Sequence, residues 1–270
     1  MGTTEVPATP KRVVVLDTAP LDGAIALGIT PVGTIRYGDP PAYLGDKIAD
    51  IKVIGQGNQP NLEAILQLQP DLILGSKIGV SRDFYEKLSQ IAPTVLTVGS
   101  GRDGEWRDNL RLYAEALGQA KAAEELLQTY RRRVRQFSDA LAPSKATRLS
   151  VLFTYSNQIG AYTTQSFAGS VLRDLGMART EEQEATHRYA LLLSAEALEA
   201  LDGDHIFLIH SAGAKGSLPK ADFVRHPIWS QLTAVQQNRI CEVSGQVWAA
   251  GRSILAAQQI LADVERCLQD

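Results

Sequence analysis

The sequence is poor in the residues that most catalytic, metal-binding and membrane-spanning proteins use. It has 4 histidines and 2 cysteines in 270 residues, and its formal net charge is only −3. A nearly balanced charge gives no basis for a nucleic-acid groove. No run of about 18 apolar residues occurs, so we expect no transmembrane helix. Cys241 and Cys267 neither establish nor exclude an oxidising compartment, and we expect two free, inert thiols.

Catalytic motifs are also scarce. No G-x-S-x-G, P-loop or H-E-x-x-H pattern occurs, and the spacings of His187, His205, His210 and His226 are unlike those of a zinc site. One G-x-G-x-x-G pattern, GSGRDG at 99–104, would suit a dinucleotide. It follows a late strand and leads into a long helix, so its context does not match a dinucleotide-binding site. A two-lobed nucleotide-using enzyme remains the weakest interpretation.

What the sequence does have is an alternation of apolar strands and amphipathic helices. Segments such as RVVVLDT, PDLILGS and PTVLTVG predict buried strands, and NLEAILQLQ and SRDFYEKLSQIA predict helices. Alternation of this kind indicates mainly parallel sheets that are covered by helices. After Gly118 the chain is rich in helix formers up to Pro143, and about 24 residues of helix span about 36 Å. We therefore expect an N-terminal lobe at 1–118, a long connecting helix at 119–143 and a C-terminal lobe at 144–270.

One helix-then-strand segment occurs twice. PNLEAILQLQPDLILGS and SAEALEALDGDHIFLIHS align at a shift of 133 residues, which pairs Glu63 with Glu196 and Asp71 with Asp204. Many α/β proteins contain such pieces, so the match alone leaves two interpretations open. Either it is a common element of the fold class, or the chain has two similar lobes.

The candidate site residues lie where ligands bind in open α/β sheets, outside the carboxyl ends of strands. Most follow a predicted strand, and two lie just before the SAEAL helix. They are Arg36, Tyr37, Asn58, Lys77, Arg102, Tyr155, Arg188, Tyr189, His210, Trp248 and Arg252. They are mainly cations and aromatics, with almost no general acid or base. This composition favours binding of an anionic, oxygen-rich ligand over catalysis, so we expect no enzyme activity.

Several segments together resemble the periplasmic iron–siderophore substrate-binding proteins whose lobes are joined by a single long helix. The characteristic ones are RVVVLDTAPLDGAIALGITPVG, PNLEAILQLQPDLILGS, YTTQSFAGSVLRDLGM, HPIWSQLTAVQQNRICEV and VWAAGRSILAAQQILADVE, and the last three are closest to the ferric citrate binding branch. The resemblance implies an α/β fold of two Rossmann-like lobes, each a mainly parallel sheet flanked by helices, with a ligand cleft between them. It also implies no cofactor, with a ferric chelate as the transported ligand.

The resemblance assigns a function and a location. Such a protein captures a ferric siderophore or ferric citrate and delivers it to an ABC permease in the inner membrane, and one glutamate on each lobe contacts the permease. Glu63 and Glu196 match those positions. The resemblance also implies a monomer in the periplasm, with or without a lipid anchor. The polar start, MGTTEVPATPKR, has no signal-peptide core, so we expect that a leader has been removed from the mature chain.

Single positions narrow the expected identity of the ligand. Trp248 falls where relatives place a cleft aromatic, and Arg188 falls where some have a cleft tryptophan. Relatives that bind hydroxamates have an arginine where this chain has Gly57, which weighs against hydroxamates. Ferric citrate is favoured because its charge could be balanced by Lys77, Arg102, Arg188 and Arg252. The alternative within the family is haem or cobalamin, for which Tyr155, Tyr189 or His210 would be the axial ligand.

Overall fold

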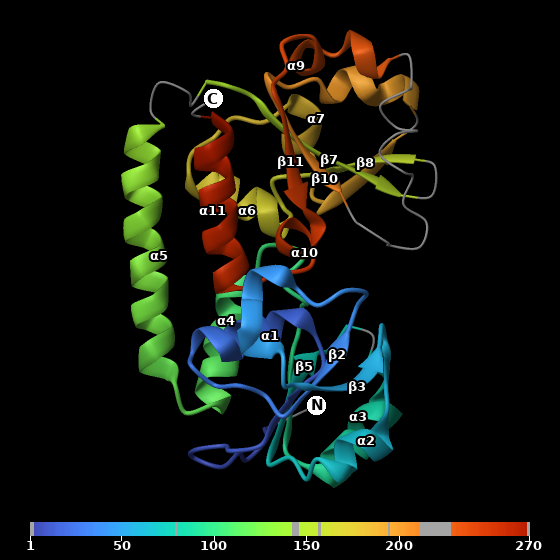
Figure 1. Ribbon diagram of the computed structural model, residues 1–270, viewed down its shortest axis with the longest axis vertical. Coiled ribbons are helices and arrows are strands. Elements are labelled where there is room, and N and C mark those ends of the chain that lie inside the picture. The colour runs from blue at the N-terminus through green and yellow to red at the C-terminus, as the bar shows by residue number, and fades with distance from the viewer. Residues whose placement is uncertain are drawn as a thin grey trace. The chain divides into compact units, whose positions relative to one another are not determined.

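The structure is a computed structural model that describes residues 3–78, 80–141, 146–155, 158–193, 195–210 and 228–268. Its chain divides into two compact units, Met1–Tyr130 with Ala250–Ala256, and Arg131–Ala249 with Ala257–Asp270. Each unit contains one β-sheet with helices against it (Figure 1), so the expected α/β fold is confirmed. The long helix α5 (Ala120–Ala140) lies within the predicted range and contributes residues to both units.

The sheet of the first unit has six strands in the order β4-β3-β2-β1-β5-β6. The strands are β1 (Val13–Val15), β2 (Gly33–Arg36), β3 (Lys52–Gln56), β4 (Gln59–Pro60), β5 (Leu72–Ser76) and β6 (Thr94–Thr97). All neighbours are parallel except β3 and β4. Since β2 and β5 flank β1 on opposite sides, the direction of winding reverses at β1. The helices of this unit are α1 (Thr18–Ala26), η1 (Ala42–Ile48), α2 (Leu62–Gln67), α3 (Arg82–Ile91) and α4 (Trp106–Ala116).

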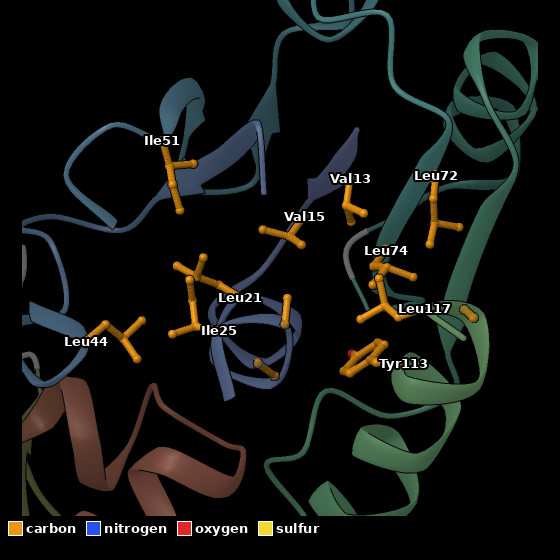
Figure 2. Packing of buried hydrophobic residues seen from close by; sticks show 13 residues of the cluster. Val13, Val15, Leu21, Ile25, Leu44, Ile51, Leu72, Leu74, Tyr113 and Leu117 are labelled. Carbon is orange, nitrogen blue, oxygen red and sulfur yellow. The ribbon is translucent and has the colours of Figure 1, made fainter. Parts of the chain in front are cut away.

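The central strands of this sheet are buried on both faces. Val13 and Val15 of β1 pack with Leu72 and Leu74 of β5 in one apolar cluster, to which α1 and α4 also contribute (Figure 2). Because side chains alternate along a strand, Ile73 points to the opposite face and packs there with residues of α2 and α3. Burial on both faces explains why these strands are continuous apolar runs in the sequence.

The sheet of the second unit is mixed. Its order is β11-β10-β7-β8-β9, with β7 (Leu149–Tyr155), β8 (Gln158–Tyr162), β9 (Ala190–Leu193), β10 (His205–His210) and β11 (Ile240–Ser244). Strands β7, β10 and β11 are parallel, whereas β8 and β9 pair antiparallel. The expected parallel arrangement therefore holds for β7, β10 and β11, and the sheet carries an antiparallel edge at β8 and β9 that was not predicted. The reason is local: β8 begins three residues after β7 ends, and so short a connection permits only an antiparallel neighbour.

The helices of the second unit are shorter than the sequence suggested. They are α6 (Phe167–Asp174), α7 (Glu181–Glu184), η3 (Ala195–Leu201), η4 (Trp229–Gln231), α9 (Thr233–Gln236), α10 (Gly245–Trp248) and α11 (Ile254–Leu268). Within the SAEALEAL segment, Ala195–Leu201 forms the 3₁₀ helix η3. The predicted helix HPIWSQLTAVQQN breaks at Leu232, whose extended backbone separates η4 from α9. In the described part of the chain, no helix combines the length and the apolar character needed to cross a membrane.

A disulfide links Cys241 of β11 to Cys267 of α11, so the expectation of two free thiols is wrong. The two residues lie 26 positions apart in sequence, and their Cα atoms are 5.9 Å apart. Their pairing depends on how α11 packs beside β11, which two cysteines at this spacing do not reveal.

Candidate ligand-binding site

A cavity of about 410 Å³ opens in the first unit beside the carboxyl ends of β1, β2 and β5. This is the point where the winding of the sheet reverses around β1, the usual position of ligand sites in open α/β sheets. Its lining residues come from the ends of these strands and the segments that follow them, from the turn between β3 and β4 with β4 itself, and from the start of α3. They are Leu16, Asp17, Ile35, Tyr37, Asn58, Gln59, Pro60, Ser76, Ile78, Val80, Ser81 and Phe84.

Tyr37 and Asn58 are the two predicted site residues that line this cavity. The Tyr37 hydroxyl donates a hydrogen bond of 3.0 Å to Oδ1 of Asn58, and the Tyr37 side chain remains 43% exposed. Partial burial raises the pKa of Tyr37 to about 12, with a further upward effect from Asp17 that Arg252 and Arg102 oppose. At neutral pH this residue is therefore an uncharged phenol, suited to hydrogen bonding rather than to supplying an anion.

Arg252 pairs with Asp17, a lining residue of the cavity, and does not itself belong to the lining. Its Nη2 contacts Oδ1 of Asp17 at 2.6 Å, its Nη1 donates to the Ser100 carbonyl at 2.9 Å, and the residue is only 5% exposed. Asp17 also accepts a hydrogen bond from the backbone N–H of Thr18 and so caps α1. Arg252 was predicted as a cation for the ligand. In the described contacts its charge is instead used to pair with Asp17, which gives Arg252 a structural role.

The GSGRDG loop packs against Arg252. Gly101 has φ of +86°, and a Cβ there would lie 2.9 Å from the Arg252 carbonyl oxygen. A Cβ on Gly99 would overlap the Glu105 side chain, whose Oε1 accepts from the Gly101 N–H at 2.7 Å. These two glycines are therefore explained by close packing inside the unit, without a nucleotide.

The other predicted cations of the first unit lie outside the cavity lining. Arg36 ends β2 and is half-buried, whereas Lys77 and Arg102 are exposed in the segments that follow β5 and β6. The positive charge of Arg102 lowers the pKa of Tyr37, so Arg102 lies within electrostatic range of this lining residue.

The predicted residues of the second unit have different environments. Arg188 and Tyr189 are exposed and lie just before β9, and their carbonyls accept hydrogen bonds from Thr163. Trp248 is 1% exposed, and its indole donates to Asp263 at 2.8 Å. The Trp248 ring also stacks on Phe207 at a centroid distance of 4.8 Å. The role of Trp248 as a ligand contact stays a prediction that these contacts do not support.

Three predicted residues have side chains outside the described part of the structure. Tyr155 ends β7, His210 ends β10, and Glu196 belongs to η3. Their proposed contacts with a ligand or a permease therefore remain predictions. Within the described ranges, no three His, Cys, Asp or Glu side chains gather in a way that could hold a metal ion.

The repeated segment performs the same local task in both units. The Asp71 carboxylate, before β5, accepts from the backbone N–H groups of Lys11 and Arg12, before β1. The Asp204 carboxylate, before β10, accepts from the N–H of Arg148, before β7. In both units the aspartate's strand is the parallel neighbour of the other strand. This equivalence supports two similar lobes over a chance match.

Glu63 is exposed in the first turn of α2, which Asn61 caps through a hydrogen bond to the N–H of Ala64. A carboxylate at this position is stabilised by the helix dipole, and it remains available to a partner. Sequence reasoning missed Asp17, Ser76 and Ile78, which also line the cavity. Each lies at or just after the end of a buried strand, and this position could have identified them. They were missed because the search was directed at cations and aromatics.

Comparison with known proteins identifies the family. The model of the periplasmic binding protein family matches residues 13–247. The chain is 34% identical to a probable siderophore-binding lipoprotein of Bacillus subtilis (strain 168), over 98% of this chain and 85% of that protein. It is 29% identical to the Fe(3+) dicitrate-binding periplasmic protein of Escherichia coli (strain K12), over 97% and 86%.

A solved structure agrees with the relatives. The crystal structure of Staphylococcus aureus SirA complexed with staphyloferrin B matches with a TM-score of 0.87 at 31% identity, covering 100% of this chain and 96% of that one. The predicted resemblance to iron–siderophore binding proteins is thereby confirmed. The chain belongs to the periplasmic binding protein family.

Proposed function

We propose that this protein captures a ferric chelate outside the cytoplasmic membrane and delivers it to an ABC permease. The observation that carries the proposal is the cavity at the winding reversal of the first sheet, in a fold shared with siderophore-binding and Fe(3+) dicitrate-binding relatives. The B. subtilis relative is a lipoprotein and the E. coli relative is periplasmic. The Cys241–Cys267 disulfide supports the same setting, because disulfides persist in oxidising compartments.

The site is suited to recognition without chemical change. Fe(III) bound by the hard oxygens of a chelator needs no ligand from the protein, so the protein recognises the outer shape and charge of the complex. Tyr37 is neutral and Asp17 is paired with Arg252, so neither is placed to act as a base. A site that holds a complex and releases it intact has no need for a proton-transfer group.

The proposed contacts divide between cavity and surroundings. Tyr37 and Asn58 contact the ligand inside the cavity, and Arg36, Lys77 and Arg102 attract its negative charge from the adjoining strand ends. Arg188 and Tyr189, which are exposed in the second unit, are proposed as further ligand contacts. Tyr155, His210, Trp248 and Arg252 complete the predicted set, and among them Arg252 acts by holding Asp17. Glu63 and Glu196 are the proposed contacts with the permease.

The test is a binding screen by isothermal titration calorimetry with ferric dicitrate, ferric siderophores, haem and cobalamin. We expect a ferric chelate to bind and Tyr37→Phe to weaken that binding about fivefold, since losing one hydrogen bond costs about 1 kcal/mol. Tyr85→Phe is the matched control, because Tyr85 lies on α3 but does not line the cavity. Binding of haem or cobalamin with no binding of any ferric chelate would refute the proposal.

A further inference from the structure

The cavity of the first unit has an almost uncharged lining. Among its described lining residues, only Asp17 carries a charge, and Arg252 neutralises that charge at 2.6 Å. Arg36, Lys77 and Arg102 do not belong to the lining. A ligand group that enters this cavity therefore finds no Lys, Arg or His side chain among the described lining residues.

The lining combines apolar side chains with a similar share of polar, mostly neutral, groups. Leu16, Ile35, Ile78 and Phe84 provide apolar surface, and the polar groups are side chains such as Asn58, Gln59 and Ser76. The Asn58 carbonyl already accepts from Tyr37, which leaves its amide to donate. Groups of this kind match an amide or hydroxyl on an otherwise apolar segment.

An anionic arm fits this cavity poorly. A carboxylate that enters it loses water and gains no counter-ion, which is costly where only neutral groups replace the water. The cations that would favour a carboxylate lie outside the lining, with Lys77 and Arg102 exposed to solvent.

Resting on the proposed function, we infer that the cavity receives a neutral, amide- or hydroxyl-bearing arm of the ferric chelate, while Arg36, Lys77 and Arg102 face its anionic, iron-bearing part. A volume of about 410 Å³ has room for such an arm. It corresponds to roughly a dozen water molecules at about 30 Å³ each. The preferred ligand is therefore a siderophore with neutral arms, in preference to ferric dicitrate, whose arms end in carboxylates.

The test compares two probes on the full chain by calorimetry. One is ferric dicitrate, and the other is a ferric chelate built on citrate whose outer carboxyls carry amide-linked aliphatic arms. We expect the wild type to bind the armed chelate at least tenfold more tightly. Ile78→Arg, at a lining position that is 52% exposed, should lower the ratio of the armed-chelate affinity to the ferric dicitrate affinity about tenfold, because it adds a cation to the neutral lining.

Val98→Arg is the matched control. Val98 is 85% exposed in the same unit, does not line the cavity, and receives the same added charge. It should leave the affinity ratio of the two probes unchanged, which separates loss of the neutral lining from general electrostatic attraction. Equal wild-type affinities for both probes, or an equal effect of Ile78→Arg on both, would overturn the inference while the proposed function stood. Failure of every ferric chelate to bind would overturn both.

Discussion

At the scale of single residues, Asp22 is the most unusual group in the first unit. It lies within α1 and is 0% exposed, yet its carboxylate accepts hydrogen bonds from the backbone N–H groups of Leu255 and Ala256, each at 2.9 Å. The Tyr43 hydroxyl donates a third, at 3.0 Å. Asp22 thereby satisfies N–H groups in the first turn of α11, which have no partner within that helix. Burial nevertheless outweighs these bonds and raises the pKa of Asp22 from 3.8 to about 6.

This raised pKa predicts a pH-dependent contribution to stability. The folded state binds the Asp22 proton more tightly than the unfolded state, so the contribution is fully present below about pH 3.8 and is lost as pH rises through about 6. At about 1.36 kcal/mol per pKa unit, the loss amounts to at most about 3 kcal/mol. Asp22→Asn should remove this dependence, whatever its own absolute stability.

Denaturant titrations between pH 4 and pH 7, followed by tryptophan fluorescence, measure the effect. The free energy of unfolding of the wild type should fall relative to that of Asp22→Asn as pH rises. Parallel pH profiles for the two proteins would contradict the assignment of Asp22. Asp50→Asn is the matched control, since Asp50 is an exposed aspartate of the same unit.

The sequence predicted part of the site at this scale. Tyr37 and Asn58 were predicted because they follow strands, and both line the cavity at the strand ends. Their contact with a ligand stays a prediction. The role of Arg252 was not predictable, because its charge is matched by Asp17, which lies 235 positions away in sequence. Burial of Trp248 could not be predicted either, since its partners Phe207 and Asp263 come from separate elements.

At the scale of elements, the sequence predicted correctly those helices and strands whose formation depends mainly on their own residues. The strands β1, β5 and β6 and the helices α2, α3 and α5 follow from their apolar periodicity and caps. Strands β8 and β9 were missed because they are defined by pairing with neighbouring strands rather than by a strong local pattern. The short segment Gln158–Tyr162 shows little strand pattern alone. Repetition of the aspartate before β5 and β10 was visible in the sequence, but its task required the structure.

The disulfide predicts a measurable stabilisation of the second unit. It closes a loop between β11 and α11 over a separation of 26 residues, for which chain-entropy reasoning gives about 2–4 kcal/mol. The double substitution of Cys241→Ser and Cys267→Ser should lower the free energy of unfolding by about that amount. Thermal and denaturant unfolding of the oxidised wild type and the double variant would measure it. Addition of a reductant is the control, because it should lower the stability of the wild type and not that of the variant.

At the scale of the whole molecule, function requires a partner as well as a ligand. Glu63→Gln combined with Glu196→Gln should leave the dissociation constant for the ferric chelate unchanged. The same double variant should reduce chelate-dependent iron uptake by cells at least tenfold, because loss of interfacial charge pairs costs about 1.4 kcal/mol or more. Glu115→Gln, another exposed helical glutamate of the first unit, is the matched control and should support normal uptake. Normal uptake by the double variant would contradict the docking role of these glutamates.

The segment Ala250–Ala256 has a consequence for how the chain acquires its structure during synthesis. It supplies Arg252 to Asp17 and the first turn of α11 to Asp22, so the first unit needs residues from almost the far end of the chain. A ribosome releases Met1–Tyr130 long before those residues emerge. Until then, two carboxylates lack the groups that hold them inside the unit, and the nascent N-terminal part is incomplete. A fragment that ends after α5 lacks the same residues, so we expect it to be less stable than the first unit of the full chain.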